Sequence, residues 1–303
     1  MTNTKRGRRP NQHTSMRRAL RRDVPATVGL LVDARDFTAM RRYRTFTFTD
    51  HPDYLHQIEG LLRTLSTQGG HTTVALFDPE DFADYCHETG LDPDSSTSRS
   101  RYTAEVAAAG PTVAYTGQPI DHLVPLLINR SVRQATWEFA TSLLSGLGAC
   151  ADCGEDIGRA AFDRASELLL RLLTSAGPGT HHLVCSVPAA DEQLLAVLHA
   201  VTGSGTPAVL DSSEGAEFTT VLAAGIALES PGGVVLRTST DDAPDQLRGW
   251  RLSHGRMAPL TEAEVFSAYC TDADTGEPIS PEPGVEYRAG FDLGDPPGTT
   301  LHH

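Results

Sequence analysis

Runs of apolar residues alternate with amphipathic stretches along most of the chain. In its first half, strands are predicted by the apolar or alternating runs 27–34, 44–49, 72–77 and 112–117. The amphipathic stretches between them predict helices, the longest of which covers residues 120–147 with a broad apolar face. Asp50 and Asp78 each precede a proline within two residues, which is typical of a helix cap and first turn. The order of these elements predicts an α/β layer.

The second half shows the same alternation. The pattern predicts helices over 158–174, from 188 to about Val201, and over 214–228, with strands over 181–187, 207–211 and 232–238. A hairpin is predicted around His254-Gly255, and Thr261 with Glu264 predicts a capping box at the start of the last helix. We therefore expect an α/β protein of two lobes, each a mostly parallel sheet flanked by helices, that meet near residues 148–158.

Charge and composition divide the chain further. Residues 1–22 contain eight of the 25 basic residues and no acidic ones, so the remainder has 17 basic against 39 acidic residues, a formal charge of −22. We expect a disordered basic arm over 1–23, α/β domains over 24–148 and 149–271, and a loop-rich tail rich in proline and glycine over 272–303. Because residues 23–303 are this acidic, they should repel nucleic acid. Binding of nucleic acid is therefore expected only through the arm, residues 1–22.

The location of the protein is constrained by what the sequence lacks. No apolar run approaches the roughly 20 residues of a membrane span, so we expect no membrane span, and the N-terminus lacks the apolar segment of a secretory signal. Five cysteines in a long chain do not suggest a secreted disulfide scaffold. These features predict a cytoplasmic protein with reduced thiols. Its arginine-rich, lysine-poor composition is typical of a GC-rich genome such as that of an actinobacterium.

The stretch LGACADCGEDIG, residues 147–158, contains the first candidate site. Cys150 and Cys153 stand two residues apart, and the glycine that follows lets the backbone turn so that its amides face the sulfurs. Such a pair is half of a tetrahedral zinc site. A thioredoxin-like dithiol and two inert thiols beside a helix are the alternative interpretations.

Residues 148–165 resemble the first knuckle of the DksA/TraR-type zinc fingers, in which C-x-x-C-G is followed by an acidic residue, isoleucine and a helix. The resemblance implies a structural zinc and contact with RNA polymerase. The second C-x-x-C of that family is absent here, so His182 and Cys185, an H-x-x-C pair, are the candidates for the other two zinc ligands. In a regular strand those two side chains would point to opposite faces, whereas His181 would share a face with Cys185.

A second candidate site combines four carboxylates. The runs VGLLVDARDF and TVALFDPEDF both lead from an apolar strand into Asp-x-x-Asp-Phe, at Asp33 and Asp36 and again at Asp78 and Asp81. Ligands bind at the carboxyl ends of parallel strands, where clustered carboxylates hold Mg²⁺ or Mn²⁺ for phosphodiester hydrolysis. The motif resembles that of NYN/PIN-type ribonucleases, although Arg35 and Phe37 stand where that family has an asparagine. Helix capping is the competing explanation for these aspartates.

Two classes of function therefore stay open. The first is a cytoplasmic regulatory or protein-interaction protein of actinobacterial type, with a protein partner and with or without one structural zinc. The alternative is a metal-dependent, NYN/PIN-like ribonuclease or phosphohydrolase that uses the four aspartates with Mg²⁺ or Mn²⁺. The first is favoured because no phosphate-binding loop, nucleophile elbow or H-E-x-x-H motif occurs in the sequence.

Overall fold

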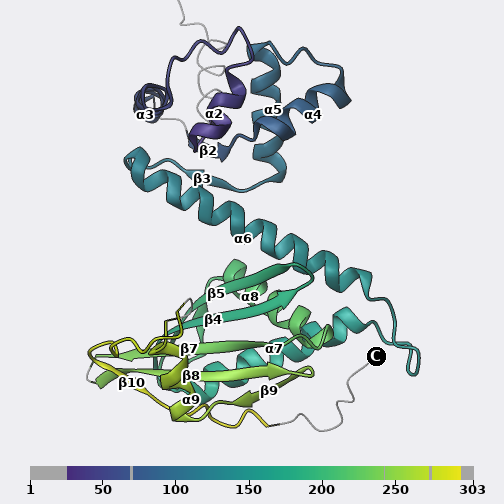
Figure 1. Cartoon of the computed structure of the whole chain (residues 1–303), viewed down its shortest axis with the longest axis vertical. Helices are drawn as coiled ribbons and strands as arrows, with labels where there is room; N and C mark the ends of the chain where they lie inside the picture. Colours follow the sequence, from purple (N-terminus) through teal and green to yellow (C-terminus); the bar gives the residue numbers. More distant parts are fainter. Residues whose placement is uncertain (1–25, 69–70, 242, 273–274, 295–303) are drawn as a thin grey trace, which may run out of the picture. The chain divides into compact units, whose positions relative to one another are not determined.

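The computed structural model describes residues 26–68, 71–241, 243–272 and 275–294 (Figure 1). The predicted basic arm, residues 1–23, lies outside these ranges. Contacts divide the chain into one unit over residues 1–134 and a second over 135–303. The division falls inside the long helix α6 (Ile120–Gly146), before the position near residue 148 that we expected from the sequence. The two units are described separately.

The first unit contains a small sheet of three strands, β1 (Ala26–Leu30), β2 (Thr72–Leu76) and β3 (Thr112–Ala114). β1 and β2 are parallel, whereas β3 runs antiparallel to β2. The unit also contains the first half of α6 and four further helices, α2 (Ala34–Met40), α3 (His51–Thr67), α4 (Pro79–Thr89) and α5 (Ser96–Ala109). Because β1 and β2 are parallel neighbours, their carboxyl ends lie on the same edge of this sheet.

Aromatic rings fill much of the core of the first unit. Segment 44–49, which we predicted as a strand, is not one; Phe46 and Phe48 instead place their rings 6.0 and 5.0 Å from that of Tyr54, between ring centroids. These two partly buried rings pack against the core, and the segment pairs with no strand of the described residues. The segment 92–100, predicted as a loop, is helical from Ser96, with Ser95 as the N-cap of α5.

The second unit is built on a sheet of seven strands. These are β4 (Gly179–Ala189), β5 (Glu192–Thr202), β6 (Val209–Leu210), β7 (Gly232–Thr240), β8 (Ala243–Ser253), β9 (Arg256–Pro259) and β10 (Val285–Tyr287). Their order is β10-β8-β7-β4-β5-β6, and β9 pairs with β8 through the predicted hairpin at His254-Gly255. β4 and β5 form the longest pair.

The α/β class is confirmed, but the prediction of mostly parallel sheets is wrong. Among the described strands of the second unit, β10 and β8 are the only parallel pair, and the other pairs are antiparallel. The reason is the length of the connections: β4 and β5 are joined by Ala190 and Asp191 alone, with Ala190 in the left-handed region at φ 52°. A two-residue link joins antiparallel strands, whereas a parallel pair needs a long crossover. The helix expected from 188 to Val201 is therefore strand β5.

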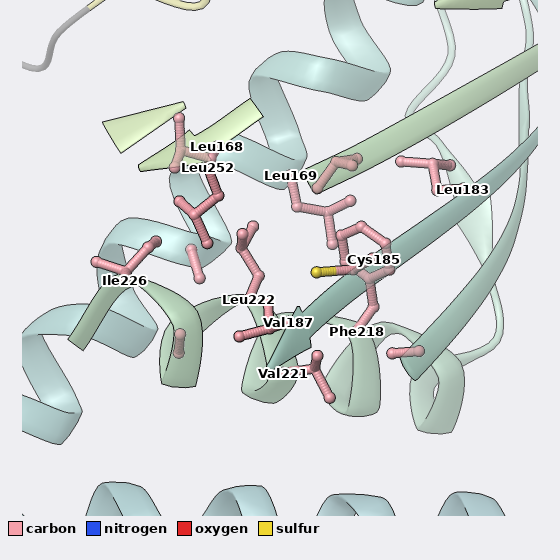
Figure 2. Close-up of a cluster of buried hydrophobic side chains, with 14 of the residues drawn as sticks. Leu168, Leu169, Leu183, Cys185, Val187, Phe218, Val221, Leu222, Ile226 and Leu252 are labelled. Atoms are coloured by element: carbon pink, nitrogen blue, oxygen red, sulfur yellow. The ribbon is translucent and has the colours of Figure 1, made fainter. Parts of the chain in front are cut away.

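Helices cover one face of the large sheet. Helices α7 (Ile157–Ala176) and α8 (Ser212–Ala227) pack on this face, and Figure 2 shows Cys185, Val187 and Leu252 from the strands meeting Phe218 and Leu222 of α8. On the opposite face, helix α9 (Glu262–Tyr269) lies over β8, where its Val265 is 3.4 Å from the position of a Cβ on Gly249. Thr261 and Glu264 form the predicted capping box of this helix.

The segment expected as a tail is largely part of the second unit where the structure describes it. Strand β10 lies within it, the indole nitrogen of Trp250 donates to the carbonyl oxygen of Phe291 at 2.9 Å, and Leu293 is buried. Apolar residues near the end of the chain thus complete the core beside Trp250. Among the described residues, no helix combines the length and the apolar character that crossing a membrane would require.

Candidate functional site

The four predicted carboxylates lie at the carboxyl ends of β1 and β2. Asp33 is the N-cap of α2, where its Oδ1 accepts from the amide of Asp36 at 2.8 Å. Asp78 is the N-cap of α4, and its Oδ1 accepts from the amides of Glu80 at 2.7 Å and Asp81 at 3.2 Å. Capping thus uses one oxygen of each of these two carboxylates.

Electrostatics show that these carboxylates share one neighbourhood. Burial raises the pKa of Asp36, and the negative charges of Asp33 and Asp78 raise it further. Burial likewise raises the pKa of Asp81, with Asp78 as its strongest charged neighbour. Asp33 and Asp78 follow the parallel neighbours β1 and β2, so these two carboxylates lie at the same edge of the sheet. In the described ranges, however, no three His, Cys, Asp or Glu side chains are placed to hold one metal ion.

The two cysteines of the C-x-x-C motif lie on a tight turn before α7. The amide of Cys150 donates to the carbonyl oxygen of Glu155 at 2.8 Å, and the amide of Gly154 donates to that of Cys150 at 2.9 Å. Gly154 has φ 75°, which glycine adopts without strain. Cys150 is buried and Cys153 is exposed. The backbone therefore turns back on itself at the C-x-x-C-G motif.

The structure does not bring the other two predicted zinc ligands to this turn. The side chain of Cys185 lies in the core beneath α8, where burial raises the pKa of its thiol to about 12 (Figure 2). His182 lies on the opposite face of β4 and pairs with His199 of β5. Alternation along a regular strand causes this separation, so Cys150, Cys153, His182 and Cys185 do not form a tetrahedral site.

His181, which shares its face with Cys185, has a structural role instead. Its ring is buried, with Nδ1 3.1 Å from Thr238 Oγ1 and Nε2 2.7 Å from Thr202 Oγ1. It thereby links β4 to both neighbouring strands. Burial lowers the pKa of this imidazole.

A further site was missed from the sequence because its strand was predicted as a helix. On the side of β5 away from β4, the described residues pair with β6 at Ala200 and Val201 alone, which leaves the rest of this edge free of other described strands. The amide of His199 points away from β4 and donates to Glu214 Oε2 at 2.9 Å. Since the backbone groups of a strand alternate between its two edges, Gln193, Leu195 and Val197 also turn their N–H and C=O groups to this free edge. No other strand of the described residues pairs with them there.

The outer face beside this edge is apolar and exposed. Leu195 and Val201 of β5 and Val209 of β6 are exposed by 50%, 53% and 72%. Val197 lies in register with Val184 of β4, which in turn lies in register with a valine of β7. Helices α7 and α8 pack on the other face of these strands, as Figure 1 shows. We call the backbone groups of residues 193–197 and this outer face of β5 the β5 edge site.

Acidic groups surround the β5 edge site. Asp191 and Glu192 are exposed at the start of β5, and Glu214 stands beside His199 at the other end. The second unit as a whole has 24 acidic and 8 basic residues, so its surface attracts positively charged partners.

Comparison with known proteins gives one match. Residues 15–118 match the model of a domain of unknown function, DUF8829. This match covers about a third of the chain and falls within the first unit. No curated protein and no solved structure matches the chain.

Proposed function

We propose that the chain is a regulatory protein-interaction protein whose second unit binds an extended segment of a partner protein along the β5 edge site. The observation that supports this most strongly is the row of backbone groups at Gln193, Leu195 and Val197, which pair with no other strand of the described residues and lie beside exposed apolar side chains. Proteins normally protect such an edge because it is a template for another strand. Addition of a strand to an open edge is a common mode of peptide recognition.

The surroundings of the edge indicate the chemistry of the partner. Main-chain hydrogen bonds hold an added strand, and its alternate side chains meet the outer face, where Leu195 and Val201 offer apolar contact. Asp191, Glu192 and Glu214 place negative charge at both ends of the edge. The expected partner segment is therefore extended and alternates basic with apolar residues.

A peptide titration tests this proposal. A fluorescent nine-residue peptide of alternating lysine and valine should bind the full chain saturably in an anisotropy assay, and more weakly as salt is raised. The same peptide with glutamate in place of lysine should not bind. Val197→Pro removes an edge N–H and should abolish binding, whereas Val184→Thr, on the same face of central strand β4, should retain it.

Two outcomes would contradict the proposal. Equal binding of the peptide by the wild type and Val197→Pro would show that the edge is not used. A stable dimer that Val197→Pro dissociates, measured by light scattering, would show that a second copy occupies the edge instead of a partner segment.

We propose a metal-dependent ribonuclease or phosphohydrolase as a second candidate, because Asp33, Asp36 and Asp78 lie at one sheet edge, where burial and the charges of Asp33 and Asp78 raise the pKa of Asp36. Labelled RNA incubated with Mn²⁺ or Mg²⁺ should then be cleaved by the wild type and not by Asp33→Asn. Asparagine also caps helices, so this variant keeps α2. Asp53→Asn, in the first turn of α3, is the control that should retain cleavage. Absence of cleavage by the wild type would contradict this second function.

A further inference from the structure

Two histidines face each other on the outer face of the large sheet. His182 of β4 and His199 of β5 are directly opposed in the register, and their ring centroids are 4.8 Å apart. The amide of His199 points away from β4, so this is a non-hydrogen-bonded pair, the kind whose side chains approach most closely. We propose that these two imidazoles bind one divalent transition-metal ion of the Zn²⁺, Ni²⁺ and Cu²⁺ class, which imidazole ligands suit.

Glu214 orients the ring of His199 for metal binding. Its Oε2 lies 3.1 Å from His199 Nδ1 and also accepts from the amide of His199 at 2.9 Å. An ionised carboxylate only accepts hydrogen bonds, so Nδ1 donates to Glu214, and Nε2 is the ring nitrogen whose lone pair a metal ion would take. The amide of Glu214 is in turn held by the N-cap Asp211 at 3.0 Å, which fixes this residue on α8. A carboxylate that orients a metal-binding histidine in this way is common in metal sites.

One cationic side chain lies close to His182. Arg237 lies beside His182 on β7, but its guanidinium is bound 2.6 Å from Asp245 Oδ2 and 2.9 Å from Glu282 Oε1. These two carboxylates offset the repulsion between Arg237 and an incoming cation.

The protein supplies two ligands to this site. In the part of the chain that the structure describes, no third His, Cys, Asp or Glu converges with them on one point. Water or a group from a bound partner would fill the remaining positions. The proposal does not depend on the binding of a partner segment at the β5 edge site, because it rests on the side chains of His182 and His199 and not on the backbone groups of residues 193–197.

Calorimetric titration of the full chain with Zn²⁺, Ni²⁺ or Cu²⁺ at pH 7.5 tests the site. All variants carry His302→Ala and His303→Ala, which removes the adjacent terminal histidines as competing ligands. We expect one ion per chain, an affinity order of Cu²⁺ above Ni²⁺, and loss of this binding in His182→Ala and in His199→Ala. Glu214→Gln should weaken it by about 10–100-fold without abolishing it.

Two control variants separate this site from other ligands. His254→Ala alters an exposed histidine at the β8–β9 turn, and Cys150→Ser removes a thiol of the C-x-x-C motif; both should bind like the parent. Binding should also weaken from pH 7.5 to 5.5 because both imidazoles must lose their protons. Undiminished binding in His199→Ala, or loss of all binding in Cys150→Ser alone, would overturn the proposal.

Discussion

Proline substitution at two adjacent positions of β5 gives a sharp test of the free edge. Ala196 is 4% exposed and lies opposite Cys185, with its N–H directed into the ladder to β4. Ala196→Pro removes that bond and leaves a buried carbonyl without a donor, which costs about 1–3 kcal/mol. The ring also overfills the core, which costs roughly another 1–3 kcal/mol. We therefore expect Ala196→Pro to lower the free energy of unfolding by about 2–6 kcal/mol.

Val197→Pro differs because the N–H of Val197 points to the free edge. No ladder bond is lost, and proline is tolerated on an edge strand where its missing N–H faces solvent. The expected cost is about 1 kcal/mol or less, from partial loss of apolar contact. Urea unfolding of the two variants, followed by circular dichroism, measures the difference. Equal destabilisation by both substitutions would refute the assignment of a free edge at residues 193–197.

Three further predictions concern parts of the fold outside that edge. Because burial lowers the pKa of His181, its imidazole takes up a proton more readily in the unfolded chain than in the folded one. The free energy of unfolding should therefore decrease below about pH 6.5. His181→Gln should reduce this decrease, measured by urea unfolding at pH 7.5 and 5.5. Gly225→Ala should destabilise the protein by about 1–2 kcal/mol, since its Cβ would lie 2.6 Å from the side chain of Leu252 in the core. Gly60→Ala, which is open to solvent on α3, should instead stabilise the protein by about 0.5–1 kcal/mol. Thermal unfolding of the two variants measures both effects. Asp33→Asn removes a neighbouring negative charge and should lower the pKa of Asp36, as measured by NMR titration; an unchanged pKa would show that the two carboxylates do not interact.

Local chemistry made several elements predictable from the sequence. Asp50, Asp78 and Thr261 are N-caps where their spacing to proline or glutamate predicted them, because capping depends only on the first turn of each helix. The shared edge of Asp33 and Asp78 was predictable for a similar reason: two apolar runs ending in aspartate form parallel neighbouring strands.

Strand β5 could not be predicted from the sequence because its conformation depends on pairing with β4. Strand β5 was predicted as a helix because both of its faces carry apolar side chains. Leu194 and Leu198 point into the core, and Leu195 and Val197 lie on the outer face. The sequence therefore lacks the alternation of apolar and polar residues that is typical of a strand. Its alanines and leucines also favour a helix, and full-length pairing with β4 overrides that preference. The apolar outer face of β5, which made the strand hard to predict, is also the feature that supports the binding of a partner segment there.

Amide hydrogen exchange along β5 tests the central claim most directly. In the free protein, the amides of Gln193, Leu195 and Val197 should exchange fast, while those of Ala196 and Leu198, bonded to β4, should be protected. Addition of the lysine–valine peptide should slow exchange at the three edge amides and leave the other two unchanged. Protection of the edge amides in the free protein, or no change when the peptide is bound, would contradict the proposal that β5 receives a partner strand.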